Sequence, residues 1–383
     1  MKKQSDRMVV AVLSLASFLH DVGSDMVFSV WPLFVTQVLG ANMAVLGLID
    51  GIGEAVVSLS GAVGGYISDK IRKRKIFVWT GYLFGGIARI GYALSPSWQW
   101  LIPFRLLDRS GKIRSAPRDA IISNISTHHN RGVRFGILRA MDNLGAVVGI
   151  LISILFLKVL GFTNLFLLAA IPSVIAVLFI IFFIREEIPH RQVLFKGISF
   201  KNFDNNLRLL TVLSGLFALG SFSYSFLLLF ANRSGFTTYQ IPILYLLFTA
   251  VAAIFSIPFG KLSDRWGRKN ILYLSYFFWV LVLVFFIFYS NFFGSILAFI
   301  FYGLHKGALE PVQKTYVAEL APTDYVASTI GAFQMVIGLM ALPASFLAGL
   351  MWDKISPTTP FYFSLSLTLI SAAMLKFVRE TKT

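Results

Sequence analysis

The sequence predicts an all-α integral membrane protein. Of its 383 residues, 56% are hydrophobic and only 14% are charged, and its mean hydropathy is +0.74. These values are far from those of an ordinary soluble domain. Apolar stretches of about 20 residues, each able to cross a ~30 Å hydrocarbon core as a helix, recur along the chain. The short segments of alternating polarity that a membrane β-barrel requires do not occur.

Apolar runs and the polar residues between them predict twelve spans. Taken in order along the chain, these are residues 8–35, 43–67, 76–95, 100–123, 134–157, 162–184, 208–231, 239–263, 270–290, 292–320, 325–350 and 358–378. When the connections are assigned alternately to two sides of a membrane, one side carries twenty-one Lys and Arg residues and the other only Lys158, Arg233 and Lys354. The positive-inside rule then places both termini in the cytoplasm. The net charge of +16 is explained by this topology and by contact with anionic membrane lipids, so nucleic-acid binding is not expected.

The chain divides into two similar halves. Residues 185–207 form a polar, basic linker between a first bundle, residues 1–184, and a second, residues 208–383. The segment that begins GYISDKIRKR at Gly65 matches GKLSDRWGRK at Gly260, an offset of 195 residues. Internal repeats of this kind are typical of secondary transporters, whose binding sites lie near the bilayer midplane where the repeats meet.

The two repeated loops resemble the signature G-x-x-x-D-[RK]-x-G-[RK]-[RK] of the major facilitator superfamily. The second copy fits fully, whereas the first lacks the later glycine. The resemblance implies the superfamily fold of twelve helices in two pseudo-symmetric six-helix bundles, in a bacterial inner membrane, acting as a monomer without a cofactor. It also implies that these loops gate the cytoplasmic ends of the bundles. The gating residues would be Gly65, Asp69, Arg74, Gly260, Asp264, Arg265 and Lys269.

The stretch FRLLDRSGKIRSAPRD, residues 104–119, resembles one bacterial branch of that superfamily, as do the following RGVRFG and RAMDNLGA. That branch contains presumed exporters. The segment GKIR is one residue shorter than the pattern of the branch, and a deletion in a helix rotates all that follows by ~100°. The family roles of Arg114, Arg118 and Asp119 are therefore not carried over. Gly145 and Gly149 are followed by Ile150 where the antiporter motif has proline, which gives antiport partial support.

Four charged residues of the fourth span, Arg105, Asp108, Arg109 and Lys112, fall on one helical stripe. Charges at membrane depth are costly and usually mark an ion, proton or substrate route. The stripe therefore predicts a hydrated path, and pairing within the helix is the alternative. Arg118 is expected to face away from the stripe and extend to lipid phosphate at the cytoplasmic end.

Three acidic residues are the predicted proton carriers: Asp21 and Asp25 in the first span and Glu54 in the second. A carboxylate at mid-membrane needs a partner or a proton, and either state suits proton coupling. A salt bridge to an arginine of the fourth or fifth span is the alternative. A metal site formed by His20 with the two aspartates is a further one, without the soft ligands or fixed spacing that would favour it.

The remaining polar residues of the spans complete a predicted substrate cavity. With the stripe of the fourth span, its members are His20, Ser24, Arg139, Asp142, Asn143, His305, Lys306, Glu310, Gln313 and Gln334. Lys306 and Glu310 are four residues apart, so pairing with each other is an equally good interpretation. The many phenylalanines of spans seven to ten favour contact with lipid or packing over binding, although an aromatic wall opposite a charged one would suit an amphiphile.

These features predict proton-coupled efflux of a small amphiphilic compound by alternating access. No phosphate-binding loop, catalytic triad or HExxH motif is found, and the absence of cysteine excludes disulfides and thiolate-bound zinc, so neither an enzyme nor a metal protein is expected. The expected partners are protons, membrane lipids and a small-molecule substrate. One alternative is proton-coupled uptake of a small organic anion or metabolite, and another is a non-transporting sensor built on a transporter fold.

Overall fold

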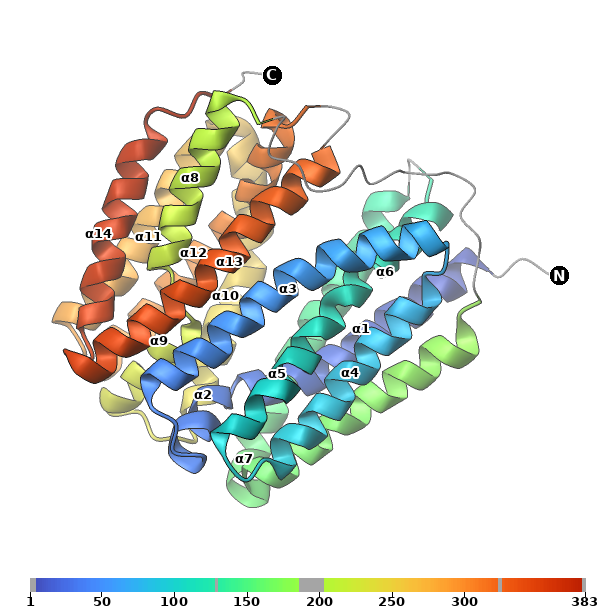
Figure 1. Ribbon diagram of the computed structural model, residues 1–383, viewed down its shortest axis with the longest axis horizontal. Helices are drawn as coiled ribbons and strands as arrows, with labels where there is room; N and C mark the ends of the chain where they lie inside the picture. Colours follow the sequence, from blue (N-terminus) through green and yellow to red (C-terminus); the bar gives the residue numbers. More distant parts are fainter. Residues whose placement is uncertain (1–4, 128–129, 186–202, 323–325, 381–383) are drawn as a thin grey trace. The chain divides into compact units, whose positions relative to one another are not determined.

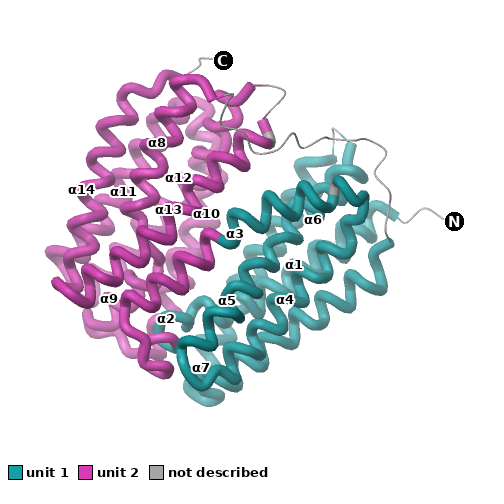
Figure 2. Tube along the Cα trace, in the orientation of Figure 1, with its two compact units in different colours: residues 1–34, 56–195 teal, residues 35–55, 196–383 magenta. Residues whose placement is uncertain are grey.

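A computed structural model describes residues 5–127, 130–185, 203–322 and 326–380, and every regular element among them is helical (Figure 1). The chain forms two compact units (Figure 2). Unit 1 consists of residues 1–34 and 56–195, and unit 2 of residues 35–55 and 196–383. Eight of the described helices are long and apolar enough to cross a membrane. The fold is therefore that of an all-helical, multi-pass membrane protein.

Unit 1 is built on α1, α4, α6 and α7, whose apolar faces share one core. Its elements are α1 (Asp6–Phe28), α2 (Trp31–Leu33), the second part of α3 (Met43–Ile71), α4 (Lys75–Leu94), α5 (Leu101–Ser110), α6 (Ser115–Ile125) and α7 (Arg131–Phe183). Leu13, Tyr82, Ile122, Leu138 and Ile180 are fully buried in this core. A π-helical turn, Phe34–Val38, follows α2.

The 53-residue α7 is two helical arms joined at Gly161, where the sequence predicts two spans. Gly161 has φ +68°, ψ 178°, a conformation that only glycine adopts without strain. Contacts with α1 show that the chain reverses here. In the first arm, Gly149 approaches Val22 and Ser153 donates to the carbonyl of Met26, so this arm runs parallel to α1. In the second arm, Ala169 lies against Gly23 and Ser173 against His20, so this arm runs antiparallel to α1.

The expected fourth span is not a continuous α-helix. Between α5 and α6, the four residues Gly111–Arg114 form a 3₁₀ turn, η3. Four residues of 3₁₀-helix turn the chain by ~480° and advance it by ~8 Å, whereas five α-helical residues give ~500° and ~7.5 Å. The tighter turn thus nearly compensates for the residue that GKIR lacks, because it leaves a calculated difference of only ~20° in place of the ~100° expected.

Unit 2 begins with the first part of α3 and continues from α8 to the C-terminal helix. Its further elements are α8 (Asn205–Gly220), α9 (Tyr224–Arg233), α10 (Ile241–Trp266), α11 (Arg268–Phe288), α12 (Phe292–Leu320), α13 (Val326–Lys354) and α14 (Thr359–Leu375). The start of α3 is fixed within this unit by Asp353 of α13, whose carboxylate accepts from the backbone N–H groups of Met43 and Ala44 at 3.2 and 2.8 Å.

Aromatic side chains form the core of unit 2. Phe226, Trp279, Phe286, Phe299 and Phe361 are at most 1% exposed, and edge-to-face and tilted ring contacts join the cluster across α9, α11, α12 and α14. Such pairs stabilise beyond the area they bury. The phenylalanine-rich spans therefore pack much of their aromatic surface inside the unit, which is one of the two interpretations that the sequence favoured.

The close packing of α1 on the first arm of α7 yields a stability prediction. A Cβ added at Gly149 would lie 2.1 Å from the carbonyl oxygen of Val22. Gly149→Leu should therefore force the helices apart and cost about 1–3 kcal/mol, seen as a lower melting temperature of the purified protein by intrinsic tryptophan fluorescence. Gly136→Leu, in the same arm with open space around it, is the matched control. Equal melting of the two variants would contradict this packing.

Candidate functional site

A buried arginine joins three helices of unit 1. Arg89 of α4 is 1% exposed. Its Nη1 donates to the carbonyl of Ala169 at 3.1 Å and to the hydroxyl of Ser173, while its Nη2 donates to the carbonyl of His20 at 3.2 Å and to Ser24 Oγ at 2.9 Å. His20 Nδ1 lies 3.1 Å from Ser173 Oγ. The predicted cavity residues His20 and Ser24 are thus held in a structural network between α1, α4 and α7.

A second cluster contains four charged residues, Arg118 and Asp119 of α6 and Arg139 and Asp142 of α7, hereafter the four-charge cluster. Arg118 lies 3.3 Å from Asp119 and 3.6 Å from Asp142. Arg139 lies 3.7 Å from Asp119 and 3.3 Å from Asp142. Each carboxylate therefore contacts both guanidinium groups, so that partners can be exchanged by small movements.

One side of the four-charge cluster is enclosed and the other is open. The Arg118 side chain is 8% exposed, whereas that of Arg139 is 62% exposed. Ser17 of α1 closes the inner side by donating to Asp142 Oδ1 and accepting from Arg118 Nη1, both at 2.5 Å. The expectation that Arg118 extends to lipid phosphate is wrong, because the 3₁₀ turn directs α6 so that this side chain points inward.

Asp21 lies near the four-charge cluster. It is half-buried on α1, one turn beyond Ser17, and the charges of Asp142, Lys112, Arg114 and Arg118 act on it. Asp25, also half-buried, follows one turn later. The structure thus places one predicted proton carrier near charged residues of the fourth and fifth spans.

The charged stripe of α5 packs on aromatic rings. The guanidinium carbon of Arg105 lies 4.4 Å from the ring centre of Trp31, and that of Arg109 lies 4.3 Å from Phe28. Arg109 also lies 3.8 Å from the carboxylate of Asp108. All three charged residues are at most 8% exposed, whereas Lys112 is half-buried. Cation–π contacts of this kind stabilise buried guanidinium groups.

The predicted cavity residues of unit 2 are less enclosed. Lys306 pairs with Glu310 at 3.7 Å, as the alternative interpretation expected, and their side chains are 34% and 64% exposed. His305 is fully buried, with Nδ1 2.9 Å from Ser275 Oγ. Of the other predicted site residues, Gln313 and Gln334 are half-buried and Glu54 is exposed, as is Asn143 of unit 1. Among the described residues, no three His, Asp or Glu side chains are arranged to hold a metal ion.

Asp50 of α3, which the sequence analysis did not select for the site, is buried at a break in the expected seventh span. It is 3% exposed and accepts from Ser223 Oγ and Ser225 Oγ, each at 2.6 Å. Ser223 caps α9, which starts after three non-helical residues that follow α8. Interrupted membrane helices often mark transporter sites. The serine-rich break SFSYS was the sequence signal, together with an acidic residue in a neighbouring span.

The gating residues differ between the two loops. In the second, Asp264 pairs with Arg268 at 2.6 Å, and Arg268 also contacts Glu319 at 2.8 Å. Lys269 Nζ donates to the carbonyls of Lys376 and Val378 in the C-terminal segment. Gly260 has open space around it, and Arg265 is exposed.

In the first loop, Arg74 is buried at the start of α4, with Nη1 3.4 Å from the carbonyl of Ala120. A Cβ on Gly65 would contact Ala116 of α6 at 3.2 Å. The side chain of Asp69 lies outside the part of the chain that the structure describes. In the RGVRFG segment, Arg134 pairs with Asp6 at 3.3 Å.

Comparison with known proteins assigns this architecture. A family model described as Major Facilitator Superfamily matches residues 13–345 and 210–383. An uncharacterized MFS-type transporter of Methanocaldococcus jannaschii is 37% identical over 378 residues, which cover 96% of this chain and 94% of the relative.

Two further likenesses are partial in different ways. The multidrug resistance protein MdtH of Yersinia pestis is 34% identical over 131 residues, 33% of this chain and 32% of that protein. A crystal structure of a mutant of the nucleoside transporter NupG superposes with a TM-score of 0.81 at 16% identity, covering 97% of this chain and 100% of that one. The second likeness concerns the fold alone.

The Arg89 network leads to a prediction about stability. Arg89→Met should leave buried carbonyls and hydroxyls without a donor, at about 1–3 kcal/mol for each, and so lower the melting temperature in detergent markedly. Arg139→Gln removes only exposed ion pairs, which contribute about 0–1 kcal/mol, and should melt almost as the parent does. If Arg89→Met melted like Arg139→Gln, the network would not be what holds these helices together.

Proposed function

Since the chain belongs to the Major Facilitator Superfamily, whose members transport small molecules across membranes, we propose that it is a proton-coupled secondary transporter that exports a small amphiphilic compound by alternating access. The observation that carries this proposal is the four-charge cluster with its inner serine. It contains two carboxylates that can take up protons and two guanidinium groups that cannot, in contact across α6 and α7 and against α1.

Protonation of Asp142 is the proposed coupling step. A proton added to its carboxylate cancels the negative charge that holds Arg118 and Arg139, and Arg118 keeps Asp119 as its ionic partner. Loss of the proton restores the first arrangement. Because the carboxylate also anchors Ser17, each exchange changes the contact between α1 and α7. Such a pair of arrangements provides the two-state element that a bound proton can bias. Asp21, Asp25 and Glu54 remain proposed proton carriers.

Export of an amphiphile is supported by the surroundings of α5 and by one relative. Arg105 and Arg109 with Phe28 and Trp31 combine cationic and aromatic groups in one place. A ligand with an apolar body and a charged group would match that chemistry. The partial likeness to a protein named for multidrug resistance favours export. We propose the same cytoplasmic termini, inner membrane, monomeric state and bundle limits that the sequence predicts.

Uptake of an organic anion is the second candidate, because cations outnumber acids in the spans of unit 1. These spans contain seven cationic residues, Arg89, Arg105, Arg109, Lys112, Arg114, Arg118 and Arg139. They contain five acidic residues, Asp21, Asp25, Asp108, Asp119 and Asp142. An excess of positive charge in a low-dielectric region attracts anions.

Flux measurements in vesicles test the proposal. The purified chain is reconstituted with a pH-sensitive dye inside, and amphiphilic cations, organic anions and lysolipids that raise its melting temperature are added against a proton gradient of either direction. Export predicts that substrate movement is driven against the proton flow. Asp142→Asn should lower gradient-driven accumulation by roughly tenfold or more, while exchange without a gradient persists.

The control for this experiment is Asp6→Asn, which removes a carboxylate near the start of α1 that is 39% exposed. It should leave coupled flux near the parent level. Substrate movement in the direction of the proton flow would favour the anion symporter instead. A protein that binds these compounds without any flux, and is indifferent to Asp142→Asn, would be a sensor and would refute transport.

A further inference from the structure

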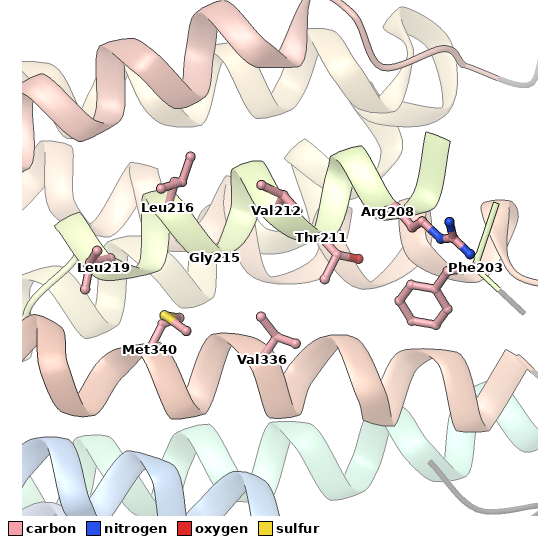
Figure 3. Close-up of a pocket in the computed structure, with 9 residues that line it drawn as sticks. All are labelled: Phe203, Arg208, Thr211, Val212, Gly215, Leu216, Leu219, Val336 and Met340. Carbon is pink, nitrogen blue, oxygen red and sulfur yellow. The ribbon is translucent and has the colours of Figure 1, made fainter. Parts of the chain in front are cut away.

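A groove in unit 2 lies outside all the charged clusters described above. It follows α8 and α13 and has a volume of about 620 Å³ (Figure 3). Its walls are formed by Phe203, Arg208, Thr211, Val212, Gly215, Leu216, Leu219, Val336 and Met340. Val336 and Met340 project from α13 toward α8, and Arg208 and Phe203 lie at the end opposite Leu219 (Figure 3). Its volume lies within the range of small-molecule sites.

The groove is apolar along its length and cationic at one end. The hydroxyl of Thr211 is bonded to the carbonyl of Leu207 at 2.7 Å, so this residue adds little polarity to the wall. Arg208 is exposed, and among the described residues no carboxylate forms an ion pair with it. Asp204, one turn earlier, uses its carboxylate to cap α8 at the N–H of Leu207. Arg208 and Leu219 are 11 residues apart, which is ~16 Å along the helix.

We infer that this groove binds one acyl chain of an anionic phospholipid, with the lipid phosphate on Arg208. The groove opens on the surface of the unit, since Val212 in its wall is 55% exposed. In a membrane-spanning protein such a surface meets acyl chains. The Arg208 end belongs to the side on which Lys and Arg accumulate, and that is the side where anionic lipids attract cations. The inference is independent of what the protein transports.

Gly215 offers a way to fill the groove without disturbing the fold. A Cβ at this position would meet Val336 Cγ1 at 3.5 Å and Met340 Cγ at 3.9 Å, which are ordinary contacts. Gly215→Leu should therefore occupy the space of the acyl chain while the helix keeps its packing. Gly61→Leu, in α3 with open space around the glycine, is the matched control. The melting temperature of each variant shows whether it is folded.

Lipid binding is measured by native mass spectrometry of the full chain titrated with phosphatidylglycerol or phosphatidylcholine of identical acyl chains. The parent should bind phosphatidylglycerol about fivefold more tightly than phosphatidylcholine, because that is the attraction expected between one cationic side chain and an anionic headgroup. Arg208→Gln should abolish that preference, mainly by weakening phosphatidylglycerol binding, whereas Lys354→Gln, at the far end of α13, should keep it. Gly215→Leu should weaken both lipids about tenfold, and Gly61→Leu neither.

Three results would overturn the inference. One is a folded Gly215→Leu variant that binds both lipids as the parent does. Another is a headgroup preference that survives Arg208→Gln and the charge-reversing Arg208→Glu. Displacement of bound phosphatidylglycerol by a transported compound in the parent, but not from Gly215→Leu, would assign the groove to substrate rather than lipid and would equally overturn it.

Discussion

Arginine placed inside membrane-spanning helices must find acceptors, because water is not available to satisfy its donors. This constraint organises unit 1. Arg89 is satisfied by carbonyls and hydroxyls, which do not titrate, so its links between α1, α4 and α7 are permanent. Arg118 is satisfied by carboxylates and a serine, and its links depend on whether those carboxylates are charged. The same side chain thus has a structural role in one network and a proposed switching role in the other.

Most of the helix positions follow from the sequence, because apolar length and turn residues determine where a membrane helix can begin and end. The buried charges were also found from their types. The way these charges group in space was not predicted, because a helical wheel assumes a rotation of ~100° for every residue. The 3₁₀ turn at Gly111–Arg114 breaks that assumption and turns Arg118 inward, toward Asp142. Asp50 was missed for another reason: its partners lie at a helix break more than 170 residues away.

The internal repeat preserves architecture without preserving chemistry. Unit 1 has arginines and aspartates in its interior, while unit 2 buries aromatic rings and keeps its Lys306–Glu310 pair partly exposed. The repeated loops differ as well, since Arg268 binds two carboxylates in the second copy. The second half also has a groove between α8 and α13, where an apolar wall ends at a single guanidinium group.

The reversal of α7 at Gly161 restricts the relative motion of the two arms of α7 in unit 1. A hairpin whose bend is one residue long cannot lengthen or swing as a flexible loop does. The arm that bears Asp142 and the arm that bears Ser173 are therefore expected to move together as one rigid body. If a proton taken up near the first arm displaced that arm, the second arm would move with it, without a series of side-chain contacts between them.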